Sequence, residues 1–125
     1  MTAPRVVITG IGMLSPLGHS VEATWQAILR GESGAGPITH FDAEGYDARF
    51  ACEVKGFDPS AFMDRKVARH LDRFAQIGLA AAKEAVADSG LEITDANAER
   101  IGVVVGSGIG GIATFEKQHS ILLEK

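Results

Sequence analysis

The chain has 125 residues, 46% of them apolar and 22% charged, which excludes a disordered chain and favours one globular domain with its own core. A formal net charge of −4 argues against nucleic-acid binding, and no apolar run approaches the roughly 20 residues of a membrane span. The single cysteine, Cys52, excludes an internal disulfide framework and fits a reducing compartment such as the cytoplasm.

The first predicted element is a buried strand over residues 5–11, RVVITGI, because a short apolar, β-branched run bounded by turn residues is typical of such strands. Gly10, Gly12 and Ser15 imitate in part the G-x-G-x-x-G fingerprint of dinucleotide-binding proteins. Pro16 lies where the helix of that motif would already be running, and no acidic residue follows about 20 residues later at a second strand end. A dinucleotide-binding domain is therefore an alternative that rests on two glycines alone.

The next segment is predicted to be a helix that Ser20 caps at its N-terminus and that Gly31 ends. Its apolar side chains recur at helical spacing and form one stripe, which we expect to face the core: Val21, Trp25, Ile28 and Leu29. Trp25 is also able to stack on a ligand, but its place on this stripe favours a packing role.

Residues 31–56 form a long irregular stretch, and a loop of this length in a compact domain is usually functional or packed on another element. A short edge strand is predicted over residues 50–54. Cys52 lies in this strand, and no histidine, glycine elbow or helix start near it would activate its thiol. We therefore interpret Cys52 as a small buried hydrophobe and not as a nucleophile.

A basic segment follows two predicted helix starts, Asp58 with Pro59 and then Asp64. If residues 65–73 form one helix, basic side chains at i, i+3, i+4 and i+7 share a face, and these are Lys66, Arg69, His70 and Arg73. Such a run is often only a solvated helix face. Cations at the N-terminal end of a helix nevertheless oppose its dipole, and this uncompensated cost indicates an acidic partner.

The clearest predicted helix covers residues 74–88, where apolar residues match the 3.6-residue repeat over three turns. Its apolar face is mostly alanine and glycine, so that a neighbouring backbone can approach closely. We expect this helix to be buried against a sheet or against another such helix, and to end at Ser89 and Gly90.

The stretch IGVVVGSGIGG, at residues 101–111, combines a second predicted buried strand with a glycine-rich loop, and open α/β sheets bind ligands where strands run into such loops. Ile109 is the one large apolar side chain in the loop, and it is either a plug in the core or the wall of an apolar pocket. A helix is predicted from Ile112 onward. Its pattern continues to the final residue, which is an unusual place for a domain to end. His119, near its apolar face, is interpreted as a packing residue.

Three motifs together resemble a known family: RVVITGIGMLSPLG, the DRKxxRxxDRF segment and GSGIGG. They occur in the order found in the N-terminal part of the type II β-ketoacyl-acyl carrier protein synthases, the condensing enzymes of bacterial fatty-acid synthesis. The resemblance covers residues 1–125. It implies an α/β, thiolase-like fold with α-β-α-β-α layers built from two similar halves, and this chain is expected to be most of the first half.

The resemblance also implies the chemistry of the complete enzyme. An acyl group passes from carrier protein to a cysteine thiolate, malonyl-carrier protein loses carbon dioxide, and the resulting carbanion attacks the thioester. Two histidines polarise the carbonyl whose oxygen gathers charge. The cysteine, the histidines and a supporting lysine are expected beyond this chain, and Cys52 does not match the nucleophile's motif. We therefore assign no catalytic residue, no metal ligand and no cofactor, and we expect this chain alone to be inactive.

One site that carries over from the resemblance is the docking surface for the acidic carrier protein. The matching positions are Lys66, Arg69 and His70, with Arg65 and Arg73 flanking them. His70 stands where a lysine is frequent, which predicts a weaker and pH-dependent contact.

The second site is the wall of the acyl pocket near the expected dimer interface, matched by Ile109 together with Gly108. Ile109 is expected to limit or gate the length of the acyl chain, because an apolar pocket measures length by shape. The type I relatives tend to have a smaller residue there, so Ile109 favours type II.

The expected partners are acyl carrier protein, its acyl and malonyl thioesters, and a second copy of the complete enzyme in a homodimer, with no nucleic acid and no membrane. Within the family, the alternatives are a type I synthase and a polyketide ketosynthase or chain-length factor. Outside it, the alternative is a non-catalytic module that folds alone and binds an acidic protein through residues 65–73.

Overall fold

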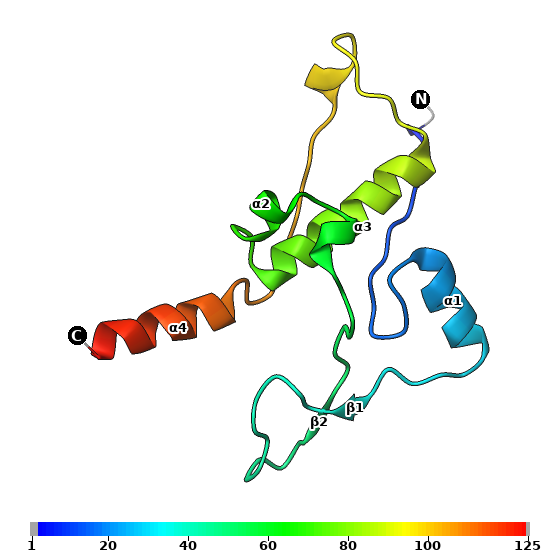
Figure 1. Cartoon of the computed structure of the whole chain (residues 1–125). Helices are drawn as coiled ribbons and strands as arrows, with labels where there is room; N and C mark the ends of the chain where they lie inside the picture. The colour runs from blue at the N-terminus through cyan, green and yellow to red at the C-terminus, as the bar shows by residue number, and fades with distance from the viewer. Residues whose placement is uncertain (1–2, 125) are drawn as a thin grey trace.

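The computed structural model describes residues 3–124, and its longest element, helix α3 (Arg73–Ser89), runs through the middle of the molecule (Figure 1). The other elements, in chain order, are α1 (Val21–Leu29), β1 (Gly36–Pro37), β2 (Phe50–Ala51), η1 (Pro59–Ala61), α2 (Arg65–Ala68), η2 (Ala98–Arg100) and α4 (Ile112–Leu123). In Figure 1, α1 lies on one side of α3, and α4 projects away on the other side.

Helix α1 begins and ends where the sequence predicts. The Ser20 hydroxyl accepts a hydrogen bond from the Ala23 amide at 3.1 Å, which satisfies one of the free N–H groups of the first turn. Gly31 follows the C-cap with φ of 68°, a left-handed conformation that glycine adopts without a steric cost. Both predicted boundary residues are confirmed.

The face that α1 buries differs from the predicted apolar stripe. Thr24 is 3% exposed and Ala27 is 1% exposed, whereas Trp25 on the stripe is 52% exposed. The cause is the turn that precedes the helix, because the hydroxyls of Ser15 and Thr24 are hydrogen-bonded at 2.8 Å and draw that side of α1 onto the turn. The predicted core role of the stripe is therefore wrong within residues 3–124.

The two predicted buried strands are not formed. Residues 5–11 and 101–105 run as irregular segments, and their valines are exposed, Val6 by 94% and Val104 by 99%. A strand needs a neighbour for its backbone N–H and C=O groups, and no strand of the described chain pairs with either segment. The expected α-β-α-β-α layers are consequently absent from residues 3–124.

The ladder that the structure does contain is short. Strand β1 pairs with β2 in antiparallel fashion, with Gly36 opposite Ala51 and Pro37 opposite Phe50. The predicted edge strand over residues 50–54 is thus confirmed in shortened form.

The N-terminal segment packs directly on the small-residue face of α3. A Cβ atom added to Gly10 would overlap the Ala85 carbonyl oxygen, and one added to Gly12 would overlap the carbonyl oxygen of Ala81. The predicted close approach to this face is confirmed, although the neighbour is an irregular segment and not a sheet. Because both glycines serve this approach, the dinucleotide-binding alternative loses the residues on which it rested.

Two carboxylates of α3 bind the backbone of the same region. Asp88 accepts a hydrogen bond from the Ile11 amide at 2.9 Å. Glu84 accepts one from the Met13 amide at 2.8 Å and another from the Val21 amide, the first residue of α1, at 2.9 Å. Glu84 therefore ties α1 to α3, and its negative charge lies at the positive end of the α1 dipole.

A small core lies where η1 and α2 pack on each other and η1 packs on α3. Its buried side chains include Phe57, Met63 and Ala68. Within the part of the chain that the structure describes, every helix is too short or too polar to span a bilayer.

The contact between Gly12 and α3 gives a first prediction. Gly12→Ala should destabilise the protein by about 1–3 kcal/mol, because the added methyl group overpacks against the backbone of α3. Gly78→Ala is the matched control, since nothing lies within 4 Å of a Cβ atom there, and it should be neutral or stabilising by roughly 0.5–1 kcal/mol. Thermal unfolding of the two variants measures the difference, and equal melting temperatures would contradict the packing described here.

Candidate functional site

The basic segment does not form the single helix that the sequence suggests. Helix α2 ends at Ala68, and α3 begins only at Arg73. The chain tightens directly after α2, where the Leu71 amide donates to the carbonyl of Ala68, three residues back, at 3.3 Å. The side-chain amide of Gln76 also donates to the carbonyls of Ala68 at 2.9 Å and Leu71 at 3.0 Å.

This break separates the five basic residues into two groups. Arg65 and Lys66 lie on α2, Arg69 is its C-cap and His70 follows directly, whereas Arg73 starts the next helix. The expectation that Lys66, Arg69, His70 and Arg73 share one face of a single helix is therefore wrong. Asp72 is the N-cap residue of α3, and an Asp before an apolar-periodic run is a helix-start signal that would have located the break.

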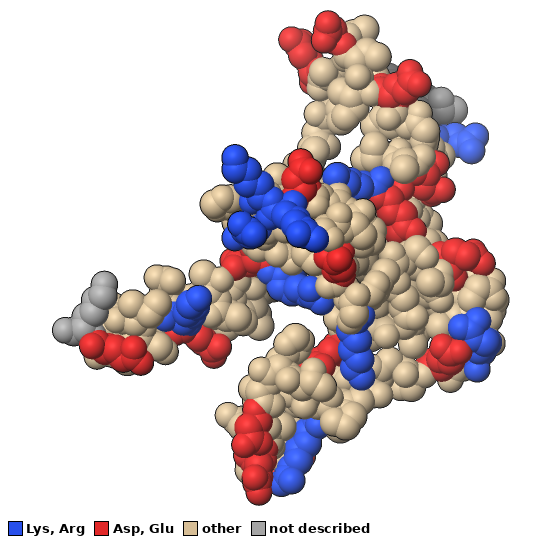
Figure 2. Space-filling model, in the orientation of Figure 1, with Lys and Arg blue, Asp and Glu red and all other residues tan. Residues whose placement is uncertain are grey.

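The α2 cations form an exposed positive surface. Arg65, Lys66 and Arg69 are exposed, and among the described residues none of the three has a carboxylate within 4.0 Å. Figure 2 shows blue side chains gathered over α2. These three side chains, called the α2 cations below, carry positive charges that no ion pair of residues 3–124 neutralises.

An open hollow of about 460 Å³ lies beside the α2 cations, and both Arg65 and Arg69 line it together with Gln76. Asp58 and Ser60 form its other wall. The Asp58 carboxylate accepts hydrogen bonds from the Ser60 amide at 2.9 Å and the Ser60 hydroxyl at 2.8 Å. These bonds lower the pKa of Asp58 below its ordinary value, and the charge of Arg65 adds to the effect.

Arg73 is exposed, but its guanidinium is hydrogen-bonded to the chain itself. Its Nη1 atom donates to the Phe57 carbonyl and its Nη2 atom to the Val54 carbonyl, each at 3.1 Å. The Cζ atom lies 4.6 Å from the centroid of the Phe57 ring, the geometry of a cation–π contact. Arg73, which is predicted to flank the docking surface, therefore bonds to other residues of this chain.

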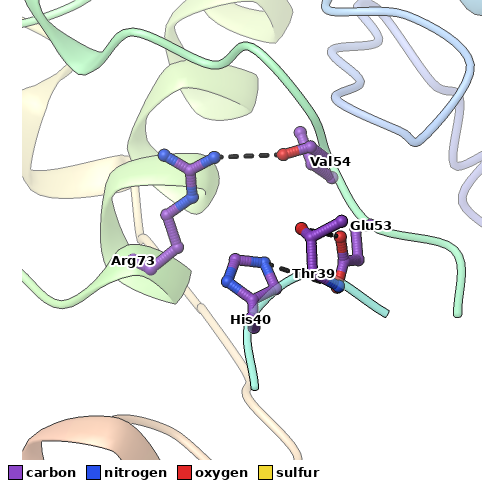
Figure 3. A network of polar contacts seen from close by, with 5 residues as sticks. All are labelled: Thr39, His40, Glu53, Val54 and Arg73. Atoms are coloured by element: carbon purple, nitrogen blue, oxygen red, sulfur yellow. Dashed lines mark hydrogen bonds and ion pairs between the residues drawn. The ribbon is translucent and has the colours of Figure 1, made fainter. Parts of the chain in front are cut away.

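A second polar cluster adjoins the segment that Arg73 binds (Figure 3). Glu53 is 9% exposed, and it accepts hydrogen bonds from the Thr39 amide at 2.9 Å and the Thr39 hydroxyl at 2.6 Å. The Nε2 atom of His40 lies 4.0 Å from the same carboxylate. The hydrogen bonds from Thr39 lower the pKa of Glu53, and His40 contributes to the same direction.

The glycine-rich loop lies beside the start of α3. The Gly110 amide donates to the Ser107 hydroxyl at 3.0 Å, and Gly110 adopts φ of 74°, which favours glycine. The Asp72 carboxylate contacts Gly111 and accepts a hydrogen bond from the Thr114 hydroxyl in the first turn of α4. Asp72 therefore joins the end of the basic segment to the loop.

An open hollow of about 310 Å³ separates these two regions, with Asp72, Phe74 and Ile77 on one side and Gly110 and Ile112 on the other. Ile109 is not enclosed by the described residues, and 78% of its surface is exposed. Nothing in the described chain lies within 4 Å of a Cβ atom added to Gly108. The structure thus brings the loop next to the basic segment, and the assignment of Ile109 and Gly108 to an acyl pocket stays a prediction.

The structure also places the remaining candidate side chains, Cys52 and His119. Cys52 is exposed, so its interpretation as a buried hydrophobe is wrong; it lies directly after β2, which ends at Ala51. His119 is exposed and stacks on Phe115 with ring centroids 6.3 Å apart. Among residues 3–124, no three His, Cys, Asp or Glu side chains gather as a metal would require.

Comparison with known proteins decides the family. The model of the beta-ketoacyl synthase N-terminal domain matches residues 3–124. The chain belongs to this family. The resemblance drawn from the three sequence motifs is thereby confirmed.

Relatives in this family match the chain along its whole length. The 3-oxoacyl-[acyl-carrier-protein] synthase 2 of Vibrio harveyi is 54% identical over 125 residues, which are 100% of this chain and 30% of that protein. The synthase 2 of Coxiella burnetii is 50% identical over 98% of this chain and 30% of its own length. The chain thus spans under a third of the length of these relatives.

A solved structure also shares the chain path. The ishigamide ketosynthase/chain length factor superposes with a TM-score of 0.72 and 34% sequence identity, over 93% of this chain and 30% of that one. Together with the family model, this likeness supports a thiolase-like fold, although residues 3–124 do not display its layers.

The Glu53 cluster gives a prediction for stability. A carboxylate with a lowered pKa stabilises the folded state above the pKa of the unfolded chain, about 4.3 for glutamate, and this contribution is lost as the pH falls through the lower folded pKa. Glu53→Gln should therefore lower the unfolding free energy at pH 7 and flatten its decline below pH of about 4.3.

Urea unfolding at several pH values tests this prediction. Thr39→Val is the matched variant, because it removes the hydroxyl donor but keeps the amide donor, and it should produce a smaller change in the same direction. Parallel pH profiles for the wild type and Glu53→Gln would show that Glu53 does not contribute in this way.

Proposed function

We propose that this chain is the N-terminal part of a 3-oxoacyl-[acyl-carrier-protein] synthase of type II. The complete enzyme elongates acyl-carrier protein by decarboxylative Claisen condensation with malonyl-carrier protein in fatty-acid biosynthesis. The observation that carries the proposal is the exposed cluster of α2 cations without an ion-pair partner in the described chain. Relatives named as 3-oxoacyl-ACP synthases at 50–54% identity support the choice of acyl carrier protein as the acidic partner.

In this proposal, the docking surface consists of Arg65, Lys66, Arg69 and His70. Exposed charges steer an oppositely charged protein during diffusion, and they affect the association rate and its salt dependence more than the final affinity. The hollow between α2 and η1 gives the partner a concave surface beside these cations. The short helix thus supplies recognition, while the condensation itself belongs to a cysteine and two histidines outside residues 1–125.

The proposed reaction uses only the enzyme's thiolate and the two thioester substrates, and it needs no cofactor. The nucleophilic thiolate takes the acyl group and releases the carrier protein's thiol. Malonyl-carrier protein then loses carbon dioxide, and the resulting carbanion forms a carbon–carbon bond to the acyl carbonyl as the enzyme's thiolate leaves. We also propose that the complete enzyme is a cytoplasmic homodimer and that Ile109 and Gly108 line its acyl pocket.

A polyketide ketosynthase or chain-length factor is the second candidate, and the solved structure of the ishigamide ketosynthase/chain length factor favours it. Its 34% identity is lower than the 54% of the Vibrio harveyi synthase 2, which favours the fatty-acid enzyme. Mass spectrometry of the products that the purified complete enzyme forms from malonyl-carrier protein, with no reductase added, distinguishes them. A fatty-acid synthase should stop at the 3-oxoacyl product of one condensation, whereas a polyketide ketosynthase should extend that unreduced product further.

The docking surface gives a prediction for the complete enzyme. Lys66→Glu combined with Arg69→Glu should slow association with acyl carrier protein about tenfold or more at low salt, and the difference should shrink as salt rises. Stopped-flow or surface-plasmon measurements at several salt concentrations record this effect. Arg100→Glu with Lys117→Glu is the control, since it changes net charge equally at exposed positions on η2 and α4. Equal losses in both double variants would refute a local docking surface.

The pocket assignment gives a separate prediction. Ile109→Phe should shorten the acyl chains that the complete enzyme accepts, because a larger side chain reduces the length of an apolar pocket. Ile109→Leu conserves volume and serves as the control, with chain selectivity close to that of the wild type. Competition between acyl-carrier protein substrates of different length measures the change, and unchanged selectivity in Ile109→Phe removes Ile109 from the pocket wall.

A further inference from the structure

Among the basic residues at positions 65–73, only Arg73 donates side-chain hydrogen bonds to the described chain. Its two terminal nitrogens donate to different carbonyls, Phe57 and Val54, each at 3.1 Å. The guanidinium also lies over the Phe57 ring, 4.6 Å from its centroid. Figure 3 shows the Arg73 side chain reaching from the first turn of α3 to Val54, in the segment that follows β2.

The segment that Arg73 binds leads directly into the proposed docking surface. Phe57 is 7% exposed, and its ring stacks on that of Phe62 with centroids 5.5 Å apart. The next residues, Asp58 to Ser60, form the wall of the hollow that faces Arg65 and Arg69. A shift of Phe57 would therefore move this wall relative to the α2 cations.

Gln76 binds the far end of the segment that begins at Val54 and runs through η1 and α2. It follows Arg73 by three residues and so lies on the same face of α3. Its side-chain amide donates to the carbonyls of Ala68 at 2.9 Å and Leu71 at 3.0 Å, at the end of α2. The first turn of α3 thus fixes where the chain enters the docking surface, through Arg73, and where it leaves, through Gln76.

We propose that Arg73 is a positioning residue for carrier-protein docking and not one of the cations that touch the carrier protein. It binds the Val54–Phe57 segment to α3 and so sets the arrangement of η1 against α2 in which Arg65, Lys66 and Arg69 meet their partner. This inference rests on the proposed function. It changes the role that the family resemblance suggests for Arg73 and leaves the other docking residues as they are.

The chemistry of arginine explains the choice of residue. A planar guanidinium can donate to two carbonyls in fixed directions while its face lies on an aromatic ring. A lysine ammonium is a point charge on a flexible stem and cannot reproduce the forked contact. Arg73→Lys therefore keeps the charge and loses the geometry, which separates a positioning role from a docking contact.

The test uses the full-length enzyme that carries this segment. Steady-state kinetics are measured with acyl-carrier protein and, separately, with a small acyl thioester that lacks the carrier protein. The variants are Arg73→Lys and Arg73→Gln, with Lys66→Gln as a docking variant and Arg100→Gln as an exposed control on η2. Each KM for the carrier protein is followed over a range of salt concentrations.

Both Arg73 variants should raise the KM for acyl-carrier protein about three- to tenfold, with kcat and turnover of the small thioester within about twofold of the wild type. Their salt dependence should match that of the wild type, because no charge at the contact is lost. Lys66→Gln should instead weaken the salt dependence, and Arg100→Gln should change neither quantity.

Several results would overturn the inference. A wild-type KM in Arg73→Lys with a reduced salt dependence in Arg73→Gln makes Arg73 a contacting cation. Failure of both variants to fold, or a parallel loss with the small thioester, makes Arg73 a support of the whole fold. A raised KM in Lys66→Gln with an unchanged KM in both Arg73 variants refutes this inference alone, whereas an unchanged KM in Lys66→Gln refutes the docking surface and this inference together.

Discussion

Backbone N–H and C=O groups outside regular structure need hydrogen-bond partners, and in this chain the side chains of α3 supply many of them. Asp88 and Glu84 accept bonds from the N-terminal segment, and Lys83 donates to the Phe62 carbonyl at 2.6 Å. Arg73 and Gln76 donate to carbonyls on either side of α2. The arrangement of the irregular segments therefore depends on one helix whose polar residues face them and whose small residues let them approach.

The same constraint explains how a four-residue helix can present the proposed docking surface. A helix this short is not stable by itself, because it forms too few internal hydrogen bonds to offset its nucleation cost. Helix α2 is held by the burial of Ala68 and by the bonds that Gln76 makes to its end. Its outer side is then free to carry exposed cations, whose mutual repulsion is a local cost that an acidic partner would relieve.

Local signals in the sequence predicted much of the helical structure. Ser20 and Gly31 mark the ends of α1, Asp58 with Pro59 marks η1, and Gly90 follows α3, since caps and left-handed glycines act within one or two turns of the chain. The break between Ala68 and Arg73 was missed, because the spacing of basic residues suggested one helix. Asp72 offered a local start signal there, whereas the bonds of Gln76 to α2 had none.

The sequence by itself determined the family, the positions of the main helices and the concentration of positive charge in residues 65–73. Only the tertiary structure decided which of those cations hydrogen-bond to the chain itself. Arg73 donates hydrogen bonds to the carbonyls of Val54 and Phe57. Gly10 and Gly12 pack directly against the backbone of α3. The physical reason is that capping and periodicity are local properties of a chain. Whether a guanidinium or a glycine faces solvent or another segment depends on contacts between residues far apart in sequence.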